Sequence, residues 1–388
     1  MSAEESKVPV ASHGKRKRWI AAVVATCAAL GIAYGIYWLT DLRYVEETDD
    51  AYVGGNVVRV TPQVAGTVIA IGADDTQFVT EGRPLVKLDP SDAKVALEEA
   101  QAQLAKAVRE VRGLFATSTQ LEASVAARRT ELAKASADLG RRERLAASGA
   151  VSTEELQHAR DTVDTAKAAL AEAEERLNAT RARIDRTTVR NHPEVLAAAA
   201  RVRDAYLMAA RTVILAPVSG LVAKRAVQVG QRVGPGAALM AIIPPDQVWV
   251  DANFKESQLA RMRIGQPATL TADIYGKRVT YHGHVEGLGA GTGSAFAVLP
   301  AQNATGNWIK IVQRVPVRIA LDAGEVRSHP LQVGLSMNVR VDTTAANGAA
   351  LPSPSAAAPV YQTHVFDTLD RDADARVEQV IAANTGRS

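Results

Sequence analysis

Apolar side chains recur every seven residues along two long stretches in the middle of the chain. The outgoing stretch carries them at Leu97, Leu104, Val111, Ser118, Val125, Leu132 and Leu139, where Ser118 is the one polar member. The returning stretch carries them at Leu156, Val163, Leu170, Leu177 and Ile184. Small residues stand three positions after many of them, as Ala100 and Ala159 do. A strict period of seven predicts two helices wound into a left-handed coiled coil, with alanines that let the axes approach closely.

The two predicted helices have nearly equal lengths and are joined by a short turn. The outgoing arm extends from Ser91 to Ala147, and the return begins at Ser152. Gly149 in the turn suits the left-handed end of the first helix, because glycine has no Cβ to hinder that conformation. Ser152 followed by Glu155 is typical of a capping box at the start of the second helix. The pattern therefore predicts an antiparallel hairpin with its tip at residues 148–152.

The returning arm is interrupted before it ends near Arg211. The tripeptide Asn191-His192-Pro193 breaks the heptad pattern, and proline is well tolerated only in the first turn of a helix. We therefore expect a separate helix from Pro193 to Ala210. Periodicity alone leaves a plain spacer or a dimerisation coil as an alternative to a projecting hairpin.

Short β-type segments flank this helical insertion on both sides. The first segment runs from Val60 to Asp89 and the second from Ile214 to Ile243. Equivalent residues fall at the same offsets in both: Gly66 and Gly220, Val68 and Val222, Val79 and Val233, Gly82 and Gly236, Leu85 and Leu239. Neither segment has enough apolar side chains to close a core alone, so we expect the two to pack on each other. Both ends of the insertion then start from one β-domain, which favours the projecting hairpin.

An uncharged apolar run of 21 residues, Trp19 to Leu39, lies near the N-terminus. A helix of this length spans roughly 30 Å, the thickness of a bilayer core. The basic residues Lys15 to Arg18 precede it, which predicts a cytoplasmic N-terminus with the remaining chain across the membrane. A cleaved signal peptide is the alternative. The run is longer than the apolar core of a usual signal peptide, however, and it ends in large residues rather than in the small residues of a cleavage site. We expect an uncleaved single-pass anchor.

The region after the second β-segment alternates in the manner of short strands separated by Gly and Pro turns. Strands are predicted at Trp249–Val250, Ala268–Ile274, Arg278–Val285, Val315–Leu321 and Met337–Val341, with an N-terminal strand within Tyr44–Val58. A short helix is expected from Phe254 to Arg263. Together these elements suit a small β-barrel. A glycine-rich loop begins at Gly287, an Ala/Pro/Ser-rich linker covers 347–359, and a polar helix is predicted over Val365–Ala383 without a defined docking site.

Composition argues against several classes of function. The net charge is +3 and aromatic residues make up 4% of the chain, so neither a polyanion partner nor a base-stacking surface is indicated. Cys27 is the single cysteine and lies in the apolar run. His282 and His284 would share one face of a strand, but a third metal ligand is missing nearby, so we interpret them as exposed histidines. We expect no enzymatic activity, no cofactor and no metal.

The two β-segments with a hairpin between them resemble the split lipoyl domain of the membrane fusion proteins, periplasmic adaptors of Gram-negative efflux and secretion systems. The resemblance is sharper in four motifs of the barrel region: Trp249–Glu256, Gly291–Phe296, Leu299–Lys310 and Val312–Val317. These motifs look like the EmrA-type branch. The resemblance implies a partnership with a drug:proton antiporter of the major-facilitator type. It also implies that the lipoyl-like domain carries no lipoyl group, which agrees with Lys87 and Lys94 lying at the entry to the hairpin rather than at an exposed turn.

In this family the tip pattern Arg-x3-Leu-x6-Ser is associated with docking onto a TolC-like outer-membrane channel. Here the pattern falls on Arg141, Leu145 and Ser152. A guanidinium can bind carbonyl or carboxylate groups of the channel, and a leucine can fill a groove. The alternative is that Ser152 only caps its helix and that Arg141 is only a solvated surface residue. A second candidate site, near the pump, is the loop with Gly291, Gly293, Phe296, Asn303 and Trp308.

The sequence thus predicts an elongated α+β multidomain fold: an N-terminal transmembrane helix, a split lipoyl-like β-sandwich, a long antiparallel α-helical coiled-coil hairpin and a small β-barrel domain. The expected parts are a cytoplasmic N-terminus (1–18), the anchor (19–39), a barrel strand (40–59), the first lipoyl half (60–90), the hairpin (91–211), the second lipoyl half (212–244), the barrel (245–343), and a linker with a C-terminal tail (344–388).

The expected function is that of a non-enzymatic inner-membrane adaptor in a tripartite multidrug efflux pump. Its expected partners are the antiporter, the TolC-like channel and further copies of itself, as a trimer or hexamer. Three alternatives remain open at this stage: an adaptor of an ATP-driven protein secretion system, a carrier domain bearing lipoate or biotin, and a structural coil of the envelope. The exported compounds cannot be inferred from these residues.

Overall fold

The computed structural model describes residues 13–40, 42–147, 149–293, 295–296, 312–345, 348–349 and 361–386, without the side chains of 13–16, 37–40 and 42. The chain divides into two compact units. One comprises Met1–Val58 with Ile242–Gln362, and the other comprises Arg59–Ala241 with Thr363–Ser388. The first contains the apolar helix and the barrel, and the second contains the sandwich and the helical hairpin.

The two β-segments that flank the hairpin fold into a single sandwich of two four-stranded sheets. The strands of the first segment are β2 (Val58–Val60), β3 (Gly66–Ile71), β4 (Phe78–Val79) and β5 (Pro84–Leu88). Those of the second are β6 (Val213–Leu215), β7 (Gly220–Arg225), β8 (Arg232–Val233) and β9 (Met240–Ile243). One sheet has the order β2-β9-β7-β4 and the other β6-β5-β3-β8, so each sheet draws on both segments.

The sandwich also has an internal symmetry that the repeated sequence pattern predicts. If each strand is exchanged for its counterpart in the other segment, β2 for β6, β3 for β7, β4 for β8 and β5 for β9, one sheet order becomes the other. Val79 and Val233 occupy equivalent places on β4 and β8, and both are buried. The prediction that the halves pack on each other is confirmed, because neither sheet can form without both.

Two of the matched glycines have the backbone conformation that the pattern required. Gly82 has φ of +79° and Gly236 has φ of +82°, in equivalent turns of the two halves. Gly66 serves a different purpose, because a Cβ there would lie 3.1 Å from Cβ of Leu88. The repeated glycines therefore combine two needs: left-handed turns and close approach of neighbouring strands.

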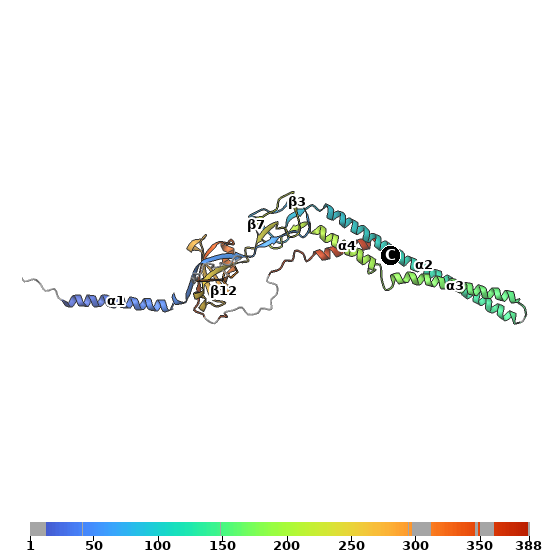
Figure 1. Cartoon of the computed structure of the whole chain (residues 1–388), viewed down its shortest axis with the longest axis horizontal. Coiled ribbons are helices and arrows are strands. Elements are labelled where there is room, and N and C mark those ends of the chain that lie inside the picture. The colour runs from blue at the N-terminus through green and yellow to red at the C-terminus, as the bar shows by residue number, and fades with distance from the viewer. Residues whose placement is uncertain are drawn as a thin grey trace, which may run out of the picture. The chain divides into compact units, whose positions relative to one another are not determined.

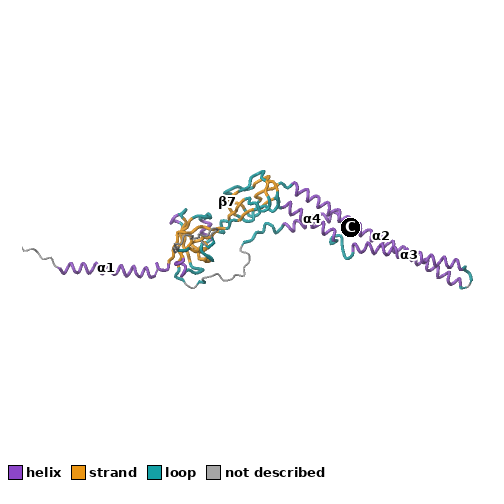
Figure 2. The backbone as a smooth tube through the Cα atoms, in the orientation of Figure 1, coloured by secondary structure: helices purple, strands orange, loops and turns teal. Residues whose placement is uncertain are grey.

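The hairpin consists of α2 (Ser91–Ala146), α3 (Thr153–Ile184) and α4 (Pro193–Ala210). Helices α3 and α4 follow one another along α2, as Figures 1 and 2 show. All the heptad positions singled out in the sequence are buried or half-buried, as the coiled-coil pattern predicts. The separate helix after Pro193 is confirmed with the expected bounds. The break is longer than predicted, because α3 ends at Ile184 and Arg186 takes a positive φ of 53°. His192 caps α4 and is almost fully buried.

At the base of the hairpin, next to the sandwich, a helix of the C-terminal tail joins α2 and α4. Helix α6 (Leu369–Asn384) lies against both α4 and α2 and appears in red beside α4 in Figure 1. Its buried residues are Ala373, Val377 and Ile381, spaced four apart on one face. The polar C-terminal helix expected from the sequence is present, and the structure supplies the docking site that the sequence left undefined.

The second β-domain is a closed barrel of six strands in the order β1-β10-β13-β12-β11-β14. The strands are β1 (Val45–Gly55), β10 (Val248–Lys255), β11 (Pro267–Ala272), β12 (Tyr281–Leu288), β13 (Arg314–Leu321) and β14 (Ser336–Asp342). Neighbours pair antiparallel throughout. The fully buried core includes Phe254, Leu270, Tyr281 and Ile319. Every strand predicted for this region is found here, with shifted ends.

Three details of the barrel differ from the prediction. The helix expected from Phe254 to Arg263 is confirmed only in part: β10 continues to Lys255, and the helix that follows is a shorter 3-10 helix, η2 (Glu256–Arg261). Phe254 is an inward strand residue of the barrel core, so burial decides its conformation over local helix propensity. A 3-10 helix, η3 (Gly276–Arg278), precedes β12, which therefore begins later than expected. The short helix α5 (Ala323–Ser328) was not predicted and is capped by Asp322.

Helix α1 (His13–Thr40) contains the apolar run. Its segment Lys17–Ile36 is the one described helix that is long and apolar enough to cross a membrane. The large apolar side chains described within it are exposed rather than packed against the rest of the chain, as Trp19 is at 75%. By length and composition this helix fits the predicted membrane anchor.

Candidate functional site

The tip of the hairpin is a tight turn, in which hydrogen bonds cap both the end of α2 and the start of α3. Gly149 has φ of +75°, the left-handed conformation predicted for the end of the outgoing arm. Its backbone N–H donates to the carbonyl of Ala146 at 3.0 Å, and that of Ala150 donates to the carbonyl of Leu145 at 3.2 Å. These bonds satisfy the last carbonyls of α2, which have no partner inside their own helix.

The predicted capping box of the returning arm is confirmed. The hydroxyl of Ser152 accepts a hydrogen bond from the backbone N–H of Glu155 at 3.2 Å. The carboxylate of Glu155 accepts from the backbone N–H and the hydroxyl of Ser152, each at 3.1 Å. These bonds, first that from the Ser152 backbone, lower the pKa of the Glu155 carboxyl from its ordinary value. Both hydrogen-bonding functions of the Ser152 hydroxyl are thus used inside the tip.

Two neighbouring arginines near the tip share one carboxylate. Arg141 Nη2 donates to Asp138 Oδ1 at 3.0 Å, and Arg142 Nε donates to Asp138 Oδ2 at 2.8 Å. The bond from Arg141 is the first cause of the lowered pKa of the Asp138 carboxyl. Arg142 also donates to the carbonyl of Glu155 at 3.4 Å, so it links the outgoing arm to the returning one. The sequence prediction missed Asp138 and Arg142, although their spacing of four on a helix is a usual ion-pair signal.

The remaining tip residue of the pattern is an exposed leucine. Leu145 is 50% exposed, and it stands one helical turn after Arg141, whose side chain is 59% exposed. Leu145 is not one of the heptad positions singled out in the sequence, which are all buried or half-buried. The structure therefore brings the three predicted tip residues to one end of the hairpin, with a guanidinium and an apolar side chain on the surface and Ser152 in a cap.

The second predicted site lies in the barrel unit and is only partly described. Phe296 is 72% exposed, and its ring lies close over Gly291, where a Cβ would be 2.6 Å from a ring carbon. Gly293 follows in the same loop and has open space around it. Asn303 and Trp308 lie outside the described residues. The described part of the loop thus carries one exposed aromatic side chain.

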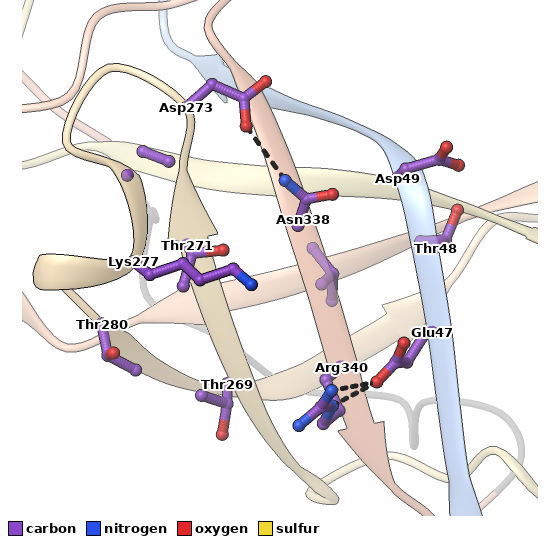
Figure 3. A pocket seen from close by; sticks show the side chains of 13 residues that line it. Glu47, Thr48, Asp49, Thr269, Thr271, Asp273, Lys277, Thr280, Asn338 and Arg340 are labelled. Atoms are coloured by element: carbon purple, nitrogen blue, oxygen red, sulfur yellow. Dashed lines mark hydrogen bonds and ion pairs between the residues drawn. The ribbon is translucent and has the colours of Figure 1, made fainter.

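A broad polar hollow of about 840 Å³ lies on the outer wall of the barrel (Figure 3). It is formed by β1, β14 and β11 with the η3 turn, and Lys277 reaches over it. Four of its polar side chains pair with one another: Glu47 pairs with Arg340, and the Asn338 side-chain amide donates to Asp273 at 3.0 Å. The sequence assigned no function to any of these residues. Their arrangement is that of a solvated strand surface, and it carries no obvious chemistry.

The histidine pair on β12 agrees with its interpretation as exposed side chains. His282 is bound to Glu325 of α5, with Nδ1 lying 2.8 Å from Oε1, and its backbone N–H donates to the same carboxylate. These bonds, first that from the backbone, lower the pKa of the Glu325 carboxyl. His284 is exposed on the same strand. Within the described ranges, no three His, Cys, Asp or Glu side chains gather as a metal site would require.

Comparison with known proteins identifies the two large modules. Residues 91–212 match the family model "EMRA, alpha-helical hairpin domain", and residues 247–342 match the "AAEA-like beta-barrel domain". The chain is 46% identical over 378 residues to "Multidrug export protein EmrA" of Escherichia coli (strain K12), covering 97% of each protein. It is 50% identical over 361 residues to "Fatty acid resistance protein FarA" of Neisseria gonorrhoeae, covering 93% of this chain and 92% of the relative.

A solved structure, that of the periplasmic adaptor protein EmrA, matches with a TM-score of 0.38 and 18% identity, covering 77% of this chain and 98% of the other. The family assignment rests on the two family models and the long sequence relatives. They confirm the resemblance inferred from the barrel motifs and the split β-domain. The chain therefore belongs to the EmrA-type branch of the membrane fusion proteins, the periplasmic adaptors of efflux systems.

Proposed function

We propose that this adaptor bridges an inner-membrane drug:proton antiporter of the major-facilitator type and a TolC-like outer-membrane channel. The observation that carries the proposal is that both arms of the hairpin begin at the sandwich, whose two sheets each contain strands of both β-segments. Because α2 follows β5 and α4 leads into β6, and these two strands pair with each other, both arms start from adjacent points. A hairpin mounted in this way is a rigid extension, which suits contact with a distant partner.

The tip is the proposed contact with the channel. Arg141 and Leu145 offer an exposed guanidinium and an exposed apolar side chain one turn apart. Ser152 contributes by shaping the turn, because its hydroxyl is already used in the capping box. Asp138 and Arg142 support the site: Asp138 holds both arginines, and Arg142 connects the two arms.

The membrane anchor and its direction are part of the same proposal. The apolar segment Lys17–Ile36 would cross the inner membrane once. The basic residues before it favour a cytoplasmic N-terminus, which leaves the barrel, sandwich and hairpin in the periplasm. The barrel loop with Gly291, Gly293 and Phe296 is the proposed contact with the antiporter, together with Asn303 and Trp308. We expect a homo-oligomer, trimer or hexamer, with energy supplied by the proton gradient of the antiporter.

Site-specific photo-crosslinking tests the bridging role. A photoreactive phenylalanine analogue at Ala147, at the end of the outgoing arm, is expected to capture the outer-membrane channel in intact cells. The matched control is the same analogue at Lys106, whose side chain is 72% exposed near the base of the hairpin. The control is expected not to capture the channel. Capture of only sister protomers from Ala147 would contradict the tip assignment.

The same method applied at Phe296 tests the choice of pump. Capture of a major-facilitator antiporter from this position would support the drug-efflux assignment. Capture of an ATPase would instead support the alternative of an ATP-driven secretion adaptor. The relatives do not define the cargo of this chain, since one is named for multidrug export and another for fatty acid resistance.

A further inference from the structure

The apolar helix connects to one particular end of the barrel. Helix α1 ends at Thr40, and β1 begins at Val45 after a short 3-10 helix, η1 (Leu42–Tyr44). Five residues of extended chain span at most about 18 Å, so the start of β1 lies within that distance of the end of α1. Because neighbouring strands are antiparallel, β14 ends beside the start of β1, and β10 ends on the same side of the barrel. We call this side the anchor end.

Three arginines lie at the anchor end of the barrel. Arg43 lies in η1, Arg261 is the last residue of η2, and Arg263 follows in the loop that leads into β11. Nη1 of Arg261 donates to the backbone carbonyl of Arg43 at 3.0 Å, and its guanidinium carbon lies 5.4 Å from the centre of the Tyr44 ring. Folding therefore ties Arg261 to the residues that directly follow α1, although 218 positions separate it from Arg43 in the sequence.

None of these three guanidinium groups pairs with a carboxylate among the residues that the structure describes. Nη1 of Arg263 donates only to backbone carbonyls, those of Ala260 at 3.2 Å and Met262 at 2.7 Å. The arginines on the barrel wall differ, since each is paired: Arg314 with Asp50, Arg318 with Asp251 and Arg340 with Glu47. The anchor end thus carries positive charge that the barrel itself does not neutralise by ion pairs.

The acidic residues of the anchor end are engaged elsewhere or stand apart. Glu47 is paired with Arg340 on the wall, and the carboxylate of Asp342 accepts from the backbone N–H of Thr344 at 2.9 Å. Glu46 is half-buried in β1. Glu256 is the first residue of η2, whereas Arg261 is the last. Arg43 and Arg261 are both exposed, so their charge is available to a partner in solution or at a surface.

We propose that Arg43, Arg261 and Arg263 bind the phosphate groups of anionic phospholipids at the surface of the bilayer that the anchor crosses. Arg43 comes three residues after Thr40 and so lies within about 11 Å of the end of α1, close to the headgroup layer. A guanidinium matches the geometry of a phosphate group, and tyrosines such as Tyr44 favour the membrane interface. The inference rests on the membrane anchor of the proposed function, but not on the identity of the antiporter or the channel.

This contact fixes how the barrel stands on the membrane. A transmembrane helix already holds the chain in the bilayer, so the arginines contribute orientation rather than attachment. Strand β12 ends at Leu288 on the anchor end, and the loop with Gly291, Gly293 and Phe296 follows it. With the anchor end seated on the headgroups, that loop is held near the membrane surface, where the proposed antiporter is accessible.

Hydrogen exchange of the full chain in lipid nanodiscs tests the proposal. One set of nanodiscs contains POPC alone, and the other contains equal parts of POPC and anionic POPG. Exchange over 256–264 is expected to be at least about fivefold slower with POPG, the effect of one arginine beside an anionic surface, and high salt should abolish the difference. Equal exchange in the two lipids would overturn the proposal. Slower exchange in POPC alone after addition of dissolved glycerol phosphate would overturn the assignment to the bilayer.

Variants locate the contact within the barrel. The double variant Arg261→Gln with Arg263→Gln is expected to lose most of the POPG effect, whereas Arg261→Lys with Arg263→Lys should keep most of it, because lysine carries the same charge. The matched control is Arg278→Gln, which removes an exposed arginine of η3 at the opposite end of the barrel. A full lipid response in the double glutamine variant, or an equal loss in the control, would refute the assignment.

Exchange over 315–321, in β13, separates loss of the lipid contact from loss of the fold and should stay at the parent rate in every variant. Arg43→Gln gives a second test that does not disturb the barrel, because the Arg43 side chain has no hydrogen bond or ion pair among the described residues. It is expected to reduce the POPG effect several-fold, and an unreduced effect would count against the proposal. A chain that nanodiscs of neither composition retain would contradict the membrane anchor itself, whereas a retained chain that does not respond to POPG contradicts the lipid contact alone.

Discussion

The base and the outer part of the hairpin belong to one pair of antiparallel arms, yet they are built differently. At the base, α2 packs against α4 and α6, and the buried cluster contains Ala100, Leu104, Val108, Val111, Val195, Ala198, Ala199, Val202, Ala205, Val377 and Ile381. In the outer part, α2 packs against α3 alone, and the buried cluster contains Val125, Ala173 and Leu177. The base is a three-helix core, and the outer part is a two-helix coiled coil.

The difference shows what a third helix adds to a narrow structure. Two helices can bury only one stripe from each partner, so the side chains beside that stripe stay partly in contact with water. The outer arms accordingly rely on exposed ion pairs between them, such as Arg129 with Glu174 and Arg181 with Glu122. At the base, α6 covers the seam between α2 and α4, and residues such as Leu104 and Val202 become fully buried. Stability should therefore fall from base to tip.

The largest expected effect comes from truncating a buried leucine at the base. Leu104→Ala should lower the free energy of unfolding of the hairpin base by about 3 kcal/mol, because Leu104 is fully buried and leaves a cavity among three helices. Leu177→Ala in the outer arm should cost about 2 kcal/mol or less, since a two-helix coil can collapse around the gap. Hydrogen exchange resolved by segment, as a function of urea, measures both. Equal losses at the two sites would contradict the comparison.

A second prediction removes the third helix without shortening the chain. Val377→Asp places a charge at a buried position of α6 and should release that helix from α2 and α4. Exchange should then become fast over 369–384 and faster than before over 97–111, while 170–177 keeps its parent rate. The matched control is Ala375→Asp on the exposed face of α6, which should leave all three segments unchanged. Release of the outer arms as well would show that the base and the outer part form one cooperative unit.

A third prediction concerns salt. Helix α6 is also held by ion pairs at its rim, Arg203 with Asp374 and Arg190 with Glu378, all with exposed side chains. Exposed pairs contribute less than about 1 kcal/mol each and are screened by salt. Raising NaCl from about 0.05 M to about 0.5 M shortens the distance over which charges interact. Hydrogen exchange should then speed up more in 369–384 than in 97–111. The buried leucine and valine contacts of α2 are not electrostatic, so an equal response would contradict this division.

Much of this architecture follows from patterns in the sequence. The repeat of Gly66, Val79 and Gly82 in the second β-segment predicts a shared sandwich, because matched offsets encode matched strands and turns. The heptads predict which side of each arm is buried. Local signals also suffice for the caps: Pro193 starts a helix, Gly149 ends one, and Ser152 with Glu155 forms the capping box.

Other features depend on contacts that no local pattern contains. The buried residues of α6 are Ala373, Val377 and Ile381, a stripe too short to identify a partner from the sequence, and the groove that receives them forms only after α2 and α4 have packed. Phe254 has neighbours that suit a helix, but closure of the barrel makes it a strand residue. At the tip, the pattern found Arg141, Leu145 and Ser152, whereas the link from Arg142 to the Glu155 carbonyl required the folded turn.

The smallest expected effect is a pH response confined to the tip. The pKa of the Glu155 carboxyl lies below its ordinary value of 4.5, first because of the hydrogen bond from the Ser152 backbone. The stabilisation of the capping box is therefore complete above about pH 4.5 and is lost as the pH falls through the lower pKa of the folded state. Asp138, whose pKa is also lowered, responds in the same direction through its bonds to Arg141 and Arg142.

Spin labels in a Cys27→Ala background can detect this loosening. A label on a cysteine replacing Ala150, beside the capping box, should become more mobile as the pH falls below about 4.5, the ordinary pKa of Glu155. Glu155→Gln should reduce this change, because the amide keeps an acceptor for the Ser152 N–H but does not titrate; any residual response belongs to Asp138. A label replacing Lys106 at the base should show no comparable change, because the apolar three-helix core does not depend on these carboxylates. A base label that loosens together with the tip label would mean that acid destabilises the whole hairpin, and the proposed gradient from base to tip would then be wrong.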